Sequence, residues 1–252
     1  MSNFDRNAAN RFASGITRTD TAYDQGLRSY LIGVYNYMAL GLAITGLVAY
    51  GVFMSAVVQN GNTLALTSFG QALFNSPLRW VVMLAPLGFV MAMSFGQARM
   101  SAATTRMVFF AFSAVMGLSL SSILLVYTAT SVANAFFISA ATFGALSLYG
   151  YTTSRSLSAM GHFMMMALFG LIIASFVGIF LHSAALQIGI SMVAVVIFAG
   201  LTAWDTQAIK SMYADGDGYE VTTKKSVFGA LQLYLDFINI FIALLRLTGD
   251  RR

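Results

Sequence analysis

The 252-residue sequence contains no cysteine, and few of its residues carry charge. Without cysteine the chain can form no disulfide framework, thiol nucleophile or cysteine-ligated zinc site. Charged residues make up 9% of the chain, whereas an average soluble domain carries roughly 25%. A water-facing surface cannot be built from so few charges, so we expect most of the surface to face lipid.

Two further features are missing. The net charge is +5, but the basic residues are scattered through tails and loops and form no basic face, so we expect no nucleic-acid partner. Residues 1–29 are polar and lack an early apolar core, so a cleaved secretory signal is not expected. The first apolar run, near Tyr30, should instead act as an uncleaved first span.

Long apolar runs are what the sequence does have, because 58% of its residues are hydrophobic. A spanning helix needs about 20 apolar residues to cross a hydrocarbon layer ~30 Å thick. The runs show no two-residue alternation, so helices are favoured over strands. We predict an all-α, polytopic membrane protein with a tail at 1–29, one transmembrane domain at 30–247 and a short basic tail at 248–252. The seven expected spans are 30–54, 79–97, 107–127, 132–151, 163–182, 188–209 and 227–247.

The distribution of basic residues predicts an orientation. Loops on the N-terminal side of the bundle and the N-terminal tail hold ten basic residues, whereas the three opposite loops share only Arg79. By the positive-inside rule the N-terminus faces the cytoplasm. The C-terminal tail is also basic, so charge counting leaves its side open. The ten residues are Arg6, Arg11, Arg18, Arg28, Arg99, Arg106, Arg155, Lys210, Lys224 and Lys225.

Small residues recur at every fourth position in two of the predicted spans. Such stripes let helices approach closely in lipid, so we interpret both as packing surfaces. One stripe is Ser113, Gly117 and Ser121, and the other is Gly170, Ala174 and Gly178.

Acidic residues are absent from Gln25 through Trp204, and then two appear inside predicted spans. Asp205 lies near the end of the sixth span and Asp236 in the middle of the seventh. A charged side chain at the centre of a membrane helix costs about 2.5–3.5 kcal/mol on insertion scales, so each acid requires a reason. Both lie in the half of the bundle predicted to be cytoplasmic, so the two side chains can meet.

Each acid lies on a polar stripe of its helix. Gln232, Asp236 and Asn239 share one helical face, and Thr202 stands one turn before Asp205. Such stripes are expected to face the bundle interior or a water-filled path. Two neighbouring carboxyl groups at low dielectric would share a proton and so respond to pH. When ionised, the same pair could bind a hard cation such as calcium.

Arg99, at the predicted cytoplasmic end of the second span, is a further candidate. Its long side chain could reach the two acids as a latch, or it could extend to the membrane interface. The sequence alone does not separate these two interpretations.

Around these residues the sequence resembles the bacterial branch of the Bax inhibitor family of membrane proteins. The most specific segment is GALQLYLDFIN at residues 229–239, followed by Phe241 and by the run from Leu244 to Arg246. Supporting segments are GLTAWDTQ at 200–207, GLSLSS at 117–122 and SLYGYTT at 147–153. The resemblance implies seven helices with six surrounding the last. It also implies a pH-sensitive calcium leak of a bacterial inner membrane, with Asp205 and Asp236 as the sensing pair and Arg99 as the latch.

Alternative functions remain open. An intramembrane aspartyl protease also uses two membrane aspartates, but it carries a Gly-x-Gly-Asp motif, whereas Asp236 follows Tyr234 and Leu235. We therefore expect no enzyme activity and no cofactor, with calcium ions and protons acting as permeating or sensed ions. The serious alternative is a regulatory protein that binds another membrane protein, such as a quality-control protease.

Overall fold

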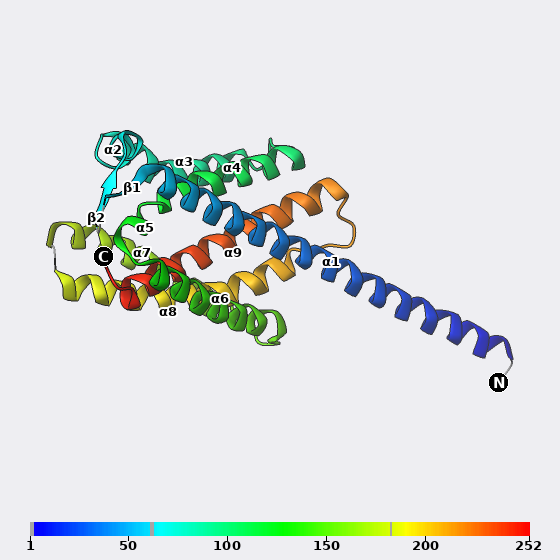
Figure 1. Cartoon of the computed structure of the whole chain (residues 1–252). Helices are drawn as coiled ribbons and strands as arrows, with labels where there is room; N and C mark the ends of the chain where they lie inside the picture. The colour runs from blue at the N-terminus through cyan, green and yellow to red at the C-terminus, as the bar shows by residue number, and fades with distance from the viewer. Residues whose placement is uncertain (1–2, 61–62, 182) are drawn as a thin grey trace.

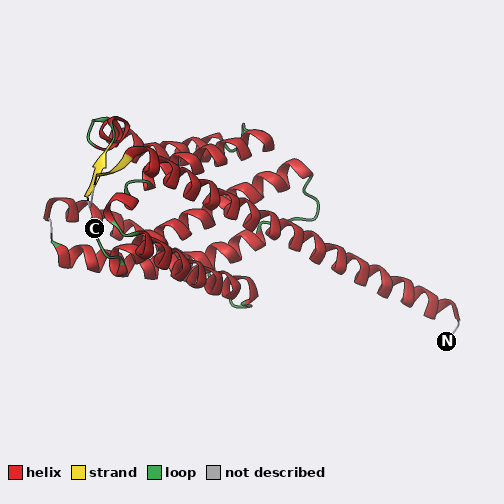
Figure 2. Ribbon diagram, viewed as in Figure 1, coloured by secondary structure: helices red, strands yellow, loops and turns green. Residues whose placement is uncertain are grey.

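The computed structural model describes residues 3–60, 63–181 and 183–252, which are mostly helical (Figure 1 and Figure 2). Within these residues, seven helices are long and apolar enough to cross a membrane. The elements are α1 (Asn3–Ala56), β1 (Val57–Asn60), β2 (Thr63–Leu66), α2 (Ser68–Phe74), α3 (Leu78–Gly96), α4 (Ala102–Leu120), α5 (Ile123–Val126), α6 (Ala129–Thr152), α7 (Ser158–Leu181), α8 (Ala184–Ser211) and α9 (Tyr219–Thr248).

The seven long helices coincide with the seven predicted spans, so the all-α, polytopic membrane fold is confirmed. Most of the long helices begin a few residues before their predicted spans, and two begin much earlier: α1 at Asn3 and α9 at Tyr219. At ~1.5 Å per residue, the 54 residues of α1 extend about 80 Å, which is more than twice the hydrocarbon thickness. The N-terminal part of α1 accordingly projects beyond the bundle (Figure 1).

The last helix, α9, occupies the centre of the bundle. In its most apolar stretch 67% of the residues are buried, against 11% for α3 and 6% for α7. The main neighbours of α9 are α1, α4, α6 and α8, whereas α3 packs mainly on α4 and α7 mainly on α8. The central position of the last helix is confirmed, but the surrounding layer consists chiefly of four helices with two more outside it.

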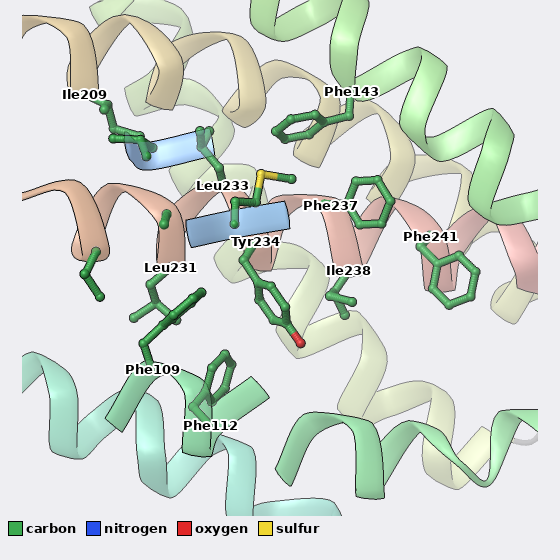
Figure 3. Close-up of a cluster of buried hydrophobic side chains, with 14 of the residues drawn as sticks. Phe109, Phe112, Phe143, Ile209, Leu231, Leu233, Tyr234, Phe237, Ile238 and Phe241 are labelled. Carbon is green, nitrogen blue, oxygen red and sulfur yellow. The ribbon is translucent and has the colours of Figure 1, made fainter. Parts of the chain in front are cut away.

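Aromatic side chains fill the space between α4 and α9. Tyr234 of α9 is fully buried, and its ring packs edge-on against Phe112 and Phe109 of α4, with centroids 5.4 and 6.0 Å away (Figure 3). On the other side of α9, Phe237 packs edge-on against Phe143 of α6 at 5.8 Å (Figure 3). Apolar contacts of this kind hold α9 between two of its neighbours.

Small residues allow the closest helix crossings. A Cβ added to Gly117 of α4 would lie 2.5 Å from the Thr45 carbonyl oxygen of α1, which confirms the first predicted packing stripe. In the second stripe, Gly178 is buried against Ile190 of α8, but Gly170 is exposed and has no atom within 4 Å of its Cβ position. The packing interpretation is therefore wrong at Gly170, because α7 contacts the bundle along a narrower line than its spacing suggests.

The chain termini lie at opposite ends of the bundle (Figure 1). The C-terminal residues pair with the connection between α5 and α6, where Tyr127 and Arg251 form an isolated β-bridge. This connection lies at the end away from the α8–α9 loop that contains Asp215. The last helix therefore crosses the bundle fully, which answers the question that charge counting leaves open.

A short hairpin stands at the same end as the C-terminus and had no counterpart in the hydropathy pattern. Strands β1 and β2 pair antiparallel, with Val57 opposite Leu66 and Val58 opposite Ala65. The hairpin is followed by α2, whose Gly70 packs against the end of α1 with a Cβ position 2.2 Å from the Ala56 carbonyl oxygen. These elements connect α1 to α3.

Candidate functional site

Asp205 and Asp236 meet in the interior of the bundle. Asp205 on α8 is 8% exposed and Asp236 on α9 is 4% exposed. Their carboxyl groups lie close enough for a hydrogen bond between them. The buried Oδ2 of Asp236 receives no N–H or O–H donor from the described residues. Because an ionised carboxylate only accepts hydrogen bonds, a bond between the two groups requires a proton on one of them. The structure thus brings the two predicted acids together, and whether they share a proton stays a prediction.

Packing between α8 and α9 places the two acids. Near the end of α8, Ile209 is buried against Gly229 of α9, whose Cβ position would lie 3.1 Å from the Ile209 side chain. One turn before Asp205, Thr202 is fully buried and donates its hydroxyl to the Phe198 carbonyl at 2.7 Å. Thr202 thus stabilises its own helix turn, and its hydroxyl proton is not available to the acid.

A chain of hydroxyl groups crosses from α1 to α8 beside Asp205. The Thr206 hydroxyl donates to the Thr202 carbonyl at 2.8 Å, so its oxygen accepts from the Ser147 hydroxyl of α6 at 3.0 Å. Ser147 in turn accepts from the Tyr35 hydroxyl of α1. Sequence reasoning missed this chain, although Ser147 opens one of the family-like segments. The chain ties three helices together at the level of the acid.

The opposite face of α9 is anchored by Tyr234, two residues before Asp236. The Thr45 hydroxyl lies 2.9 Å from the Gly41 carbonyl and 2.8 Å from the Ser113 carbonyl. Its one proton serves these acceptors, so the Tyr234 hydroxyl is the donor in the 2.6 Å contact with Thr45. This bond joins α9 to α1 and α4 and restrains rotation of the helix that carries Asp236.

The polar stripe predicted on α9 is only partly interior. Asp236 is buried, and Asn239 is half-buried and donates to the Leu235 carbonyl of its own helix at 2.8 Å. Gln232 is exposed. The stripe therefore runs from the surface of α9 into the core, and of its three members only Asp236 contacts the other acid.

Arg99 lies exposed in the turn after α3. Oε1 of Glu220, in the first turn of α9, accepts from the backbone N–H of Ala102 at 2.9 Å, which places this turn beside the start of α9. Asp236 lies sixteen residues further along α9, or about 24 Å at ~1.5 Å per residue. Among the described residues Arg99 makes no ion pair with either acid. The latch is not formed in this structure, and its role stays a prediction.

The α8–α9 loop packs on α1 at the end of the bundle nearest the aspartate pair. The ring of Tyr213 lies 5.3 Å from that of Tyr23 and 5.7 Å from that of Tyr30, and its hydroxyl donates to Asp215 at 3.2 Å. Desolvation, and then the hydrogen bond to Asp215, raise the pKa of the Tyr213 hydroxyl above its ordinary value. The phenol therefore remains a donor at neutral pH and holds the loop in place.

The donor set around the pair does not suit tight calcium binding. Within the ranges that the structure describes, no group of three or more histidine or acidic side chains converges as a metal site. Calcium takes six to eight oxygen ligands, and two carboxyl groups supply only part of such a shell.

Comparison with known proteins is consistent with this architecture. A family model described as "Inhibitor of apoptosis-promoting Bax1" matches residues 27–252. An uncharacterised protein of Rickettsia prowazekii is 44% identical over 236 residues, which cover 94% of this chain and 95% of the relative. The inner membrane protein YbhL of Escherichia coli is 42% identical over 230 residues, covering 90% and 94%. An uncharacterised Caulobacter vibrioides protein is 40% identical over the full length of both chains.

Proposed function

Because this chain belongs to the Bax inhibitor family, we propose that it is a calcium-permeable leak of a bacterial inner membrane, controlled by pH through Asp205 and Asp236. The observation that carries the proposal is the pair of neighbouring, buried carboxyl groups between α8 and the central helix. A lone structural acid would find a donor on a neighbouring helix, whereas these two acids face each other. The proposal includes no catalytic step and no cofactor.

Protonation changes the charge at the centre of the bundle. With one proton the pair carries a single negative charge and α8 and α9 are held together by the shared hydrogen bond. With two protons that charge is lost, and with none the two carboxylates repel each other at low dielectric. Each state favours a different spacing of the two helices, so pH can shift the equilibrium between closed and open arrangements.

In this proposal the arrangement seen in the structure is the closed form. Beyond the pair, toward the C-terminal end, the buried side chains of α9 are all apolar: Phe237, Ile238, Ile240, Phe241, Ala243 and Leu245, of which Phe237, Ile238 and Phe241 are labelled in Figure 3. An ion passing this apolar segment would lose its hydration without gaining oxygen ligands. Conduction therefore requires movement of α9 relative to α1, α4, α6 or α8.

The proposal is tested by calcium flux into vesicles that contain the purified protein and a calcium-sensitive dye. The rate should exceed that of empty vesicles and should change between about pH 5 and pH 8, where a coupled buried carboxyl pair can titrate. Vesicles with the Asp205→Asn, Asp236→Asn double variant provide the matched control. Flux equal to that of empty vesicles at every pH would instead favour a regulatory protein that binds another membrane protein.

The proposed orientation places the N-terminus and the α8–α9 loop in the cytoplasm. It rests on the excess of basic residues at the end of the bundle that holds the N-terminus. The excess remains when the three arginines of the C-terminal region are counted at the opposite end. Reporter domains fused within the loop at Gly216 and after Arg252 should report the cytoplasm and the periplasm, respectively. Both reporters on one side would contradict the full crossing by α9, and an exchange of the two would contradict the orientation alone.

A further inference from the structure

The C-terminal residues form a fixed strap. The backbone N–H of Arg252 donates to the Val126 carbonyl at 2.9 Å, and the N–H of Thr128 donates to the Asp250 carbonyl at 3.2 Å. The N–H of Asp250 also donates to the Ser131 hydroxyl at 3.0 Å. These bonds hold the four residues after α9 against the connection between α5 and α6. The arginine between Asp250 and Arg252 is consequently held in one place.

That arginine, Arg251, faces a hollow between α7, α8 and α9. Its guanidinium carbon lies 6.0 Å from the centre of the Tyr127 ring. The hollow has a volume of about 560 Å³. Its polar lining consists of Tyr127, Ser175, Gln187, Ser191, Arg246 and Arg251.

The lining of the hollow is positively charged. Arg246 lies on the last turns of α9, and Arg251 reaches the hollow from the strap. Neither arginine makes an ion pair with a described residue, and no Asp or Glu lines the hollow. The first residue of α8, Ala184, also borders it, so the positive end of a 28-residue helix dipole adds to the potential. The last turns of α7 and α9, which also border the hollow, contribute dipoles of the opposite sign, so the two arginines are the groups that make the hollow attractive to an anion.

The hollow lies at the level of a membrane surface. Arg246 stands two residues before the end of α9, α7 ends at Leu181, and α8 begins at Ala184. These are the levels at which lipid headgroups begin. The arginines also depart from the charge bias of the chain, since they lie at the end where basic residues are few. An anionic ligand would explain their presence there.

From these observations we propose that the hollow bounded by Arg246 and Arg251 binds the phosphate group of an anionic ligand, at the end of the bundle opposite the α8–α9 loop. Arginine presents a planar fork of N–H donors that matches two phosphate oxygens. The hydroxyl of Tyr127 and the amide of Gln187 can donate to the remaining oxygens, whereas the Ser175 hydroxyl already donates to the Leu171 carbonyl at 2.8 Å. The strap holds Arg251 in position before the ligand arrives, which lowers the entropy lost on binding. This site is independent of the proposed calcium leak.

Thermal unfolding of the purified full chain in detergent tests the proposal. The unfolding midpoint is measured with added short-chain phosphatidylglycerol and with added short-chain phosphatidylcholine. It is also measured in inorganic phosphate and in chloride at equal ionic strength. We expect phosphatidylglycerol or phosphate to raise the midpoint. Arg246→Gln or Arg251→Gln should each weaken the apparent affinity about tenfold or more, as expected for loss of a charged hydrogen bond.

Arg252→Gln is the matched control. Arg252 belongs to the same strap, but its guanidinium lies over Phe53 of α1 and does not line the hollow. Its replacement should leave the affinity unchanged. Arg246→Lys, which keeps the charge but removes the fork, should bind with intermediate affinity and replaces Arg246→Gln if that variant does not fold.

The arms of the experiment separate the sources of the ligand. Stabilisation by phosphatidylglycerol alone assigns the site to a lipid headgroup, and stabilisation by inorganic phosphate as well assigns it to any accessible phosphate. Two results would overturn the proposal: no stabilisation by either ligand, or equal stabilisation of the wild type and the Arg246 and Arg251 variants.

Discussion

Changing Asp205 or Asp236 to asparagine is expected to flatten the pH dependence of calcium leak through the reconstituted protein, and making both changes should add little. Asparagine resembles a protonated aspartate in shape and charge, so either change removes the shared proton. The two carboxyl groups interact directly in the structure. Residues in contact typically show coupling energies of about 0.5–3 kcal/mol in double-mutant cycles. Leak rates for the wild type, both single variants and the double variant, measured between pH 5 and pH 8, provide the cycle.

The direction of the flux change is a separate question from its pH dependence. The same acids can contact the passing ion, so a variant can be open and still conduct poorly. Asp24→Asn is a suitable control, because Asp24 is exposed on α1 and its replacement makes the same change in charge. If both single variants keep the wild-type pH profile, or if their effects simply add, the aspartates are independent structural groups.

Gly150→Ala is expected to destabilise the protein strongly, because the added methyl group has no space between α6 and α8. A Cβ at Gly150 of α6 would lie 2.2 Å from the carbonyl oxygen of Ala203 and 2.9 Å from its carbonyl carbon. Both are backbone atoms of α8, so the helices must separate. Overpacking of a core typically costs about 1–3 kcal/mol, and a clash with backbone should reach or exceed the upper value. Separation would also break the bond between Ser147 and Thr206 that lies beside Asp205.

Gly144→Ala, on the same helix, is the matched control for this prediction. Gly144 has no atom within 4 Å of its Cβ position, and alanine is the better helix former. The control variant should therefore unfold at or slightly above the wild-type temperature, whereas Gly150→Ala should unfold well below it or fail to give monodisperse protein. Equal unfolding temperatures for the two variants would show that α6 and α8 do not cross as closely as described.

Hydropathy predicted the spans because a helix must present about 20 consecutive apolar residues to cross the hydrocarbon layer. It did not predict where α1 and α9 begin, since Asn3 and Tyr219 start polar helical turns that continue a span into water. It also carried no signal for the hairpin of β1 and β2, whose four-residue strands are too short to show a pattern. The side of the C-terminal tail required the observed pairing of Tyr127 with Arg251, which no local feature predicts.

The candidate site was predictable at its two acidic residues, because a charged side chain inside a membrane helix costs free energy and is therefore rare. Asp205 and Asp236 stand out in an otherwise acid-free region, and the structure brings them together. Residues that are common in membrane helices gave no such signal. The hydroxyl chain through Ser147 could not be separated from the many serines that bond only to their own helix. Helical spacing likewise predicted an interior position for Gln232, which is exposed because it lies on the less buried face of α9, together with Phe228, Leu235 and Asn239.

The central position of α9 has a consequence for biosynthesis, because the helix that completes the core is the last one made. At about 5–20 residues per second, the 30 residues of α9 take about 2–6 s to translate. During that time the six earlier spans are already in the membrane without the helix that joins α1, α4, α6 and α8, and Asp205 has not yet met its partner. Assembly must therefore end with a helix entering between others that are already inserted. A chain truncated before Tyr219 would keep every earlier span and lack the core that organises them.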